Sequence, residues 1–152
     1  MTTSGSLSRQ GHRLLQLGML LFLFALLIGL AVPRFAVPRL GLSAHLLGLM
    51  QGIFLMALGL VWPRLRFTRV VARFGFVLAV YGCVVAWIAN LSAAILGVGS
   101  SILPIAAGSA HGSPLQEKMI TVALRSAGAS LIGAALLVLW GLRHRDGAHD
   151  SD

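Results

Sequence analysis

Five polar or ionisable side chains interrupt long apolar stretches of this 152-residue sequence, and they are the residues most able to do chemistry. A polar side chain surrounded by hydrocarbon costs on the order of a few kcal/mol, so each one is a candidate functional residue. Counting helical turns places three of them at one depth and two nearer the middle. The residues are His45, Asn90 and Arg125, and then Gln51 and Tyr81. Two polar layers are therefore expected to face one another.

His45 precedes Gly48 and Gly52 by three and seven residues, which places all three on one helical face. Neutral imidazole is a common haem ligand, so one hypothesis is that His45 ligates a metal centre or a flat macrocycle lying on the glycine face. The alternative is that Gly48 and Gly52 form a small-xxx-small contact with another helix. The residues alone leave both interpretations open.

Each of the other polar residues also has more than one interpretation. Arg125 could pair with Glu117, bind a substrate oxygen, or extend its side chain to the membrane interface. Tyr81 and Asn90 could contact a substrate or bond a neighbouring helix. Together with Gln51, we predict Tyr81, Asn90 and Arg125 as catalytic residues.

Several familiar catalytic patterns are absent from the sequence, including paired carboxylates, a glycine-rich phosphate loop, a CxxC pair and a Ser-His-Asp set. Glu117 is the only acidic residue before the C-terminal tail. Two-carboxylate hydrolysis and proton transport through an intramembrane carboxylate are therefore disfavoured. The single cysteine, Cys83, lies in an apolar run and is expected to be a buried hydrophobic residue.

The elements that position these residues are four apolar runs of membrane-spanning length. The chain is 57% hydrophobic and 11% charged, with a mean hydropathy of +0.89, too apolar to cover a water-facing surface. We predict an all-α, integral membrane four-helix bundle with one transmembrane domain spanning residues 1–152. The helices are expected at about 14–32, 44–62, 72–96 and 119–141, with polar tails at 1–10, taken as disordered, and 143–152.

The ends and connections of these runs carry further signals. The first run could be a secretory signal peptide, but it is longer than usual and lacks a clean cleavage site, which favours a retained helix. Trp62 is a candidate interfacial anchor. The stretch from Gly97 to Lys118 is too interrupted for a span and too apolar for a solvated loop, so we expect it to fold back over the bundle.

The net charge of +8 marks topology in the membrane rather than nucleic-acid binding, because most basic residues flank apolar runs. Eight basic residues fall on one side and three on the other, with Arg125 left out as part of a helix. The sets are Arg9, Arg13, Arg64, Arg66, Arg69, Arg73, Arg143 and Arg145, against Arg34, Arg39 and Lys118. We predict an inner-membrane protein in contact with the lipid bilayer, with both termini cytoplasmic and no nucleic-acid partner.

The segment GLSAHLLGLMQGIFLMALGLVWP, from Gly41 to Pro63, resembles the second helix of hydroxylaminobenzene mutases, small membrane proteins of four spans. Weaker similarities extend over most of residues 11–141. That family is similar in turn to styrene oxide isomerases, in which the matching histidine ligates haem b and the matching amide approaches the substrate. The resemblance implies His45 as an iron ligand and Gln51 as a substrate contact.

The resemblance further implies an isomerase that converts small aromatic substrates, turning an arylhydroxylamine into an aminophenol. Three positions depart from the family pattern: Gln51 replaces an asparagine, Leu47 an expected acid and Ala86 an expected polar residue. The alternatives are a non-enzymatic subunit, either haem-binding or structural, and a transporter or lipid-interacting scaffold. The small-residue faces of the second and fourth runs predict a homo-oligomer.

Overall fold

The computed structural model describes residues 3–143 and contains four long helices, with no strand among the residues described. A short helix and two 3₁₀ turns connect them. The elements in chain order are α1 (Thr3–Ala31), η1 (Val32–Arg34), α2 (Pro38–Val61), η2 (Trp62–Arg64), α3 (Arg69–Leu96), α4 (Pro104–Ala107) and α5 (Pro114–Arg143). The long helices are each long and apolar enough to cross a membrane, which confirms the predicted all-α fold with four spanning helices.

Proline and glycine set the helix boundaries. Pro38 and Pro114 stand at the first positions of α2 and α5, where a missing N–H costs nothing because that group has no partner inside the helix. The Thr68 hydroxyl caps α3 by accepting a hydrogen bond from the amide of Val71 at 3.4 Å. Gly97 ends α3 in the left-handed conformation, with φ of 68°.

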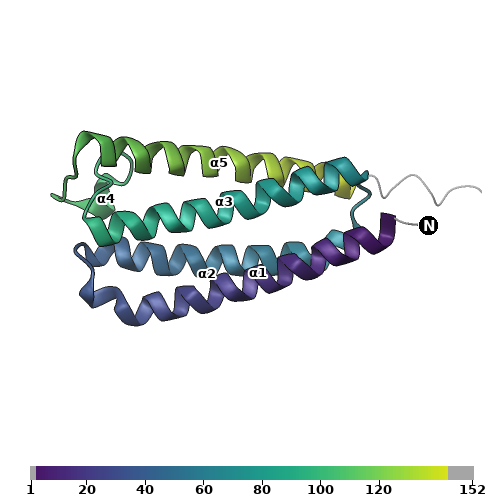
Figure 1. Cartoon of the computed structure of the whole chain (residues 1–152), viewed down its shortest axis with the longest axis horizontal. Helices are drawn as coiled ribbons and strands as arrows, with labels where there is room; N and C mark the ends of the chain where they lie inside the picture. The colour runs from purple at the N-terminus through teal and green to yellow at the C-terminus, as the bar shows by residue number, and fades with distance from the viewer. Residues whose placement is uncertain (1–2, 144–152) are drawn as a thin grey trace, which may run out of the picture.

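Successive long helices run antiparallel, and they form a bundle that is open on one side. In Figure 1, the start of α1 and the end of α5 lie at one end of the molecule, and α4 lies at the other. Helix α1 packs mainly on α2, α2 packs on α3, and α3 packs on α5. Among the described residues, α5 does not pack against α1 or α2. A seam therefore remains between α2 and α5.

Helices α1 and α2 meet through glycines that let their backbones touch. A Cβ atom on Gly18 would lie 2.7 Å from the carbonyl oxygen of Gly52, and one on Gly11 would lie 2.7 Å from that of Gly59. No larger side chain fits at these crossings without separating the helices. The predicted small-residue contact of α2 is confirmed, with α1 as its partner.

Helices α3 and α5 pack through small residues and one hydrogen bond between the helices. The Ser130 hydroxyl donates to the carbonyl oxygen of Leu78 at 2.9 Å, and Ala79 and Ala134 are buried at the same contact. Such contacts replace the hydrophobic driving force that helices lack in lipid. Other residues of the same two helices line the groove described below.

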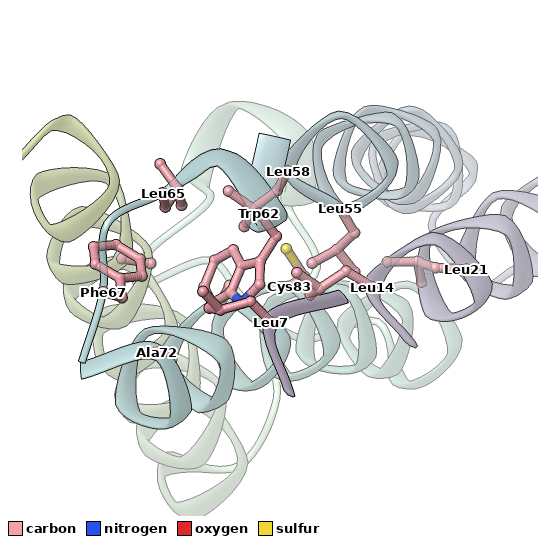
Figure 2. Close-up of a cluster of buried hydrophobic side chains, with 12 residues drawn as sticks. Leu7, Leu14, Leu21, Leu55, Leu58, Trp62, Leu65, Phe67, Ala72 and Cys83 are labelled. Atoms are coloured by element: carbon pink, nitrogen blue, oxygen red, sulfur yellow. The ribbon is translucent and has the colours of Figure 1, made fainter. Parts of the chain in front are cut away.

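The main core gathers residues from all four long helices. Figure 2 shows Cys83 among side chains that include Leu14, Leu55 and Trp62, and all four are fully buried. The prediction that Cys83 is a buried hydrophobic residue is confirmed. The prediction that Trp62 is an interfacial anchor is wrong, because its ring is buried and its Nε1 donates to Gln10 Oε1 at 3.0 Å.

The first helix begins at Thr3 rather than near Leu14, so residues 3–10 are helical and the expected disordered tail is wrong for them. Leu7 packs into the core and Gln10 accepts the bond from Trp62, and both contacts hold the polar start of the helix in place. The other helices also start three to six residues earlier than expected. Of the predicted C-terminal tail, residues 144–152 lie outside the described residues.

The connection between α3 and α5 folds over the end of the bundle, as predicted. Ala107 of α4 and Val98 are buried against Leu40 at the start of α2. The amide of Val37 donates to the carbonyl oxygen of Ala94, which ties the first connection to α3 at the same end. This end of the molecule is called the loop end below.

Candidate active site

A groove of about 430 Å³ occupies the seam between α2 and α5. Its walls are almost entirely apolar, and they come from three helices. The residues are Leu47, Met50, Gln51 and Phe54 of α2, Cys83 of α3, and Leu131, Ile132 and Ala135 of α5. Gln51, Cys83 and Ile132 each lie near the middle of their helices, so the groove lies near the middle of the bundle.

Gln51 is the only polar side chain besides the Cys83 thiol that borders this groove. The residue is 6% exposed, and its Oε1 atom is buried without a hydrogen-bond partner in the described part of the chain. An unpaired buried acceptor costs about 1–3 kcal/mol, a cost that a ligand bringing an O–H or N–H group would remove. The groove therefore suits a small apolar molecule, and the residue at its border with an unpaired acceptor is Gln51.

His45 lies on a different face of α2 from Gln51. Six residues separate them, which corresponds to about 120° around the helix, and His45 does not border the groove. Its Nδ1 lies 2.7 Å from the carbonyl oxygen of Ala25 on α1, and its ring packs against Gly29. Because a carbonyl oxygen can only accept, Nδ1 carries the proton in this contact.

Gly48 and Gly52 are both used for packing between helices. A Cβ atom on Gly48 would lie 2.5 Å from the Trp87 Nε1 atom and 2.7 Å from the Ala25 methyl group. One on Gly52 would meet the backbone oxygen of Gly18 at 2.8 Å. The glycine face is thus covered by α1 and by Trp87 of α3, which matches the packing interpretation of these residues.

Tyr81 and Asn90 bond neighbouring helices outside the groove. The Ser126 hydroxyl donates to the carbonyl oxygen of Ala123, so the exposed Tyr81 hydroxyl donates to Ser126 Oγ, at 3.0 Å. Asn90 is buried and its Nδ2 donates to Ser43 Oγ at 3.1 Å, while its Oδ1 has no partner among the described residues. The structure does not bring Tyr81 or Asn90 to Gln51, and their catalytic role stays a prediction.

Arg125 borders a second cavity, of about 590 Å³, at the loop end of α5. Glu117 borders the same cavity but makes no ion pair with Arg125 in the described chain. Both carboxylate oxygens of Glu117 instead accept hydrogen bonds from the α3–α5 connection, mostly from backbone amides. The donors are the amides of Gly99, Ser100, Ser101 and Gly112 and the hydroxyl of Ser100, at 2.9–3.3 Å.

The sequence interpretation missed the α5 wall of the groove. Leu131, Ile132 and Ala135 come about 80 residues after Gln51, and their side chains are indistinguishable from ordinary lipid-facing residues. The only signal was the amide of Gln51 in the middle of an apolar helix. No group of three or more His, Cys, Asp or Glu side chains that could hold a metal ion occurs within the described residues.

Comparison with known proteins shows the family to which this chain is similar. The sequence model of the Styrene oxide isomerase family matches residues 10–143. The protein Hydroxylaminobenzene mutase HabB of Ectopseudomonas oleovorans is 45% identical over 141 residues, 93% of this chain and 86% of that protein. Hydroxylaminobenzene mutase HabA of the same organism is 36% identical over 125 residues, 82% of this chain and 93% of that protein. No solved structure matches the chain.

Proposed function

Because this chain belongs to the styrene oxide isomerase family and is an isomerase, we propose that it rearranges arylhydroxylamines to aminophenols in the groove between α2 and α5. The two relatives are named as hydroxylaminobenzene mutases, which supports this substrate class. The rearrangement breaks the N–O bond, forms a C–O bond on the ring and moves one ring hydrogen to nitrogen. Reactant and product have the same composition, so no oxidant or reductant is needed.

The unpaired Oε1 of Gln51 is the observation that carries this proposal. An arylhydroxylamine offers both an apolar ring for the groove and an N–H or O–H group for the amide oxygen. An aryl epoxide has the ring but no donor, so it would leave Oε1 unpaired. Gln51 therefore orients the hydroxylamine group, and Leu47, where a relative's acid was expected, keeps that part of the wall apolar.

The test is conversion of phenylhydroxylamine to 2-aminophenol by the purified protein, with product separated by liquid chromatography. Turnover by wild type and by Gln51→Asn, with loss in Gln51→Leu, is the expected result. Gln16→Leu is the matched control, because Gln16 is an exposed amide on α1. Failure of the wild-type protein to convert any of several arylhydroxylamines would refute the proposal.

We also propose that His45 is the protein ligand of haem b, as the family resemblance implies. His45 fits as the residue that would hold the iron, because Ala25 holds its Nδ1–H and its Nε2 has no hydrogen-bond partner in the described chain. Gly48 and Gly52 do not fit the predicted platform for a flat macrocycle, because α1 and Trp87 already cover them. When bound, haem would supply a Lewis-acidic iron, and because His45 does not border the groove, the proposed role of Gln51 does not depend on it.

The haem proposal is tested by an absorption spectrum of protein purified from haem-replete cells. A Soret band in wild type that is lost in His45→Ala is the expected result. His111→Ala is the matched control, because His111 is an exposed histidine of the α3–α5 connection. A wild-type protein without a Soret band would refute haem binding while leaving the groove assay to judge the isomerase proposal.

The setting we propose is the inner membrane, with both termini cytoplasmic and several copies assembled. Arginines gather at the end of the bundle where α1 starts and α5 ends, which supports a cytoplasmic location for that end.

Gly128 of α5 faces open space and Ala129 is exposed, so this helix has room for a second copy. Reporter fusions at each connection test the orientation, and light scattering of the detergent-purified protein tests the assembly.

A further inference from the structure

The cavity at the loop end of α5 has the character of an anion site. It is separate from the groove, and it gathers polar side chains from α5 and from the connection before it. Lys118, Thr121 and Arg125 of α5 border it together with Glu117, Ser100 and His111. Three α5 residues spaced by three and four positions lie on one helical face, so their side chains point to the same volume.

The two cations in this cavity have no carboxylate partner. Glu117 is the only acidic residue in the described chain, and its oxygens are already bound by four backbone amides and the Ser100 hydroxyl. No ion pair joins Lys118 or Arg125 to it in residues 3–143. Positive charge in the cavity is therefore available to a ligand.

Helix geometry directs the Arg125 side chain toward this volume. Arg125 is rooted about 10 Å farther along α5 than Lys118. Side chains on a helix lean toward its N-terminus, so the Arg125 stem runs along α5 toward Lys118. Lys118 leans the same way, and both side chains border the same cavity, where a guanidinium and an ammonium can bind one phosphate together.

A hydroxyl group between the two cations also lacks a partner. Thr121 follows Lys118 by three residues and precedes Arg125 by four, and its Oγ1 is buried without a hydrogen bond to any described residue. An unpaired buried hydroxyl is costly, and a phosphate oxygen would accept its proton. His111 adds a ring whose Nδ1 is bonded to Ser100 Oγ at 2.9 Å.

Exposed apolar side chains of α5 lie at and near the border of the cavity. Val122 lines the cavity and is exposed, and Met119 and Leu115 are exposed on the same helix. A ligand with a phosphate next to long acyl chains satisfies both parts of this surface, whereas free phosphate uses only one. We propose that this cavity binds the phosphate of an anionic phospholipid headgroup, held by Lys118, Arg125 and Thr121.

The test compares two double variants that remove the same charge from the same end of the bundle. Lys118→Gln with Arg125→Gln changes the cavity, and Arg34→Gln with Arg39→Gln changes two exposed arginines that do not border it. Phosphatidylglycerol is titrated into detergent-purified protein, and bound lipid is counted by native mass spectrometry. We expect about tenfold weaker binding or more in the cavity variant and little change in the control.

Further variants and a competition experiment distinguish lipid binding from misfolding and from binding of free phosphate. Lys118→Arg with Arg125→Lys keeps the charge and should keep the lipid, which shows that loss in the cavity variant is not misfolding. Thr121→Val should weaken binding by a smaller factor. Equal lipid binding by the two charge-removing variants would overturn the proposal. So would displacement of the lipid by inorganic phosphate at comparable concentration, because the site would then recognise free phosphate.

Discussion

Gln51 and Glu117 are both buried polar side chains of long apolar helices, yet their oxygen atoms differ completely in hydrogen bonding. Glu117, at 8% exposure, accepts five hydrogen bonds from the connection that it holds together. Gln51, at 6% exposure, has an Oε1 atom with no partner among the described residues. All the acceptor oxygens of Glu117 are hydrogen-bonded in the folded chain, whereas the Oε1 acceptor of Gln51 has no partner among the described residues.

The difference separates structural polar groups from functional ones. A saturated carboxylate stabilises the fold because removing it would leave several donors unpaired. An unpaired acceptor alone does not mark a site, since Asn90 Oδ1 and Trp87 Nε1 are also unpaired in the described chain. Gln51 is distinguished because its orphaned atom belongs to a residue that borders a groove large enough for an aromatic ring.

The largest expected effect is on stability at the loop end. Glu117→Ala leaves four backbone amides without their acceptor, and we expect the free energy of unfolding to fall by at least about 3 kcal/mol. The measurement is denaturant or thermal unfolding in detergent, followed by circular dichroism. Ser113→Ala, which removes only a helix-capping hydroxyl of α5, should cost about 1 kcal/mol. A Glu117→Ala protein as stable as wild type would break the comparison.

The next effect falls on activity rather than stability. Gln51→Leu should lower kcat/KM for phenylhydroxylamine by about 10- to 100-fold, because one buried hydrogen bond to the substrate is lost. Its free energy of unfolding should stay equal to wild type or rise, since an unpaired acceptor is removed. Steady-state kinetics and an unfolding curve on the same sample check both. Clear destabilisation by Gln51→Leu would show that Gln51 is structural like Glu117.

A bulky side chain that fills the groove should also lower kcat/KM, but by less than Gln51→Leu does. Ile132 is 64% exposed at the groove wall, so Ile132→Trp can place its ring over the opening without disturbing the core. We expect kcat/KM to fall by about tenfold and the melting temperature to stay unchanged. Leu139→Trp, on the same face of α5 two turns away, is the control and should keep wild-type kinetics. Equal kinetics for both variants would argue against the groove as the site.

The smallest expected effect is the loss of stability when one of the five hydrogen bonds to Glu117 is removed. Ser100→Ala removes one donor and leaves the four backbone amides in place, so it should cost only about 0.5–1.5 kcal/mol of stability. Activity at low temperature should not change, because Ser100 does not border the groove. Unfolding of Ser109→Ala, at an exposed serine of the same connection, is the reference. A loss as large as that of Glu117→Ala would mean that Ser100, not the carboxylate, organises the connection.

Much of the fold was predictable because hydropathy and proline act locally. The four apolar runs and the stops at Pro33 and Pro63 predicted the helices and their order. The early start of α1 was missed because it depends on Leu7 packing and on the Gln10 to Trp62 hydrogen bond, which join residues about 50 positions apart. The same long-range packing decided that Trp62 is buried rather than interfacial.

The candidate site was predictable only in part, for the same reason. Gln51 and His45 stood out as polar residues in an apolar helix, and their roles stay predictions. The contact of Gly48 and Gly52 with α1 required the partner helix to be placed. The walls from α5 and the separation of Arg125 from Gln51 depend on which helices touch, and α2 and α5 do not.

The sequence by itself determined that this chain forms four membrane-length helices, because apolar content, length and the positions of proline act within each segment. It also determined which few side chains are polar inside those helices. Only the tertiary structure decided which of these polar atoms find partners, because a hydrogen bond needs two groups brought together from distant parts of the chain. The oxygens of Glu117 have hydrogen-bond partners, and Gln51 borders a groove, because of how the helices and the connection pack together.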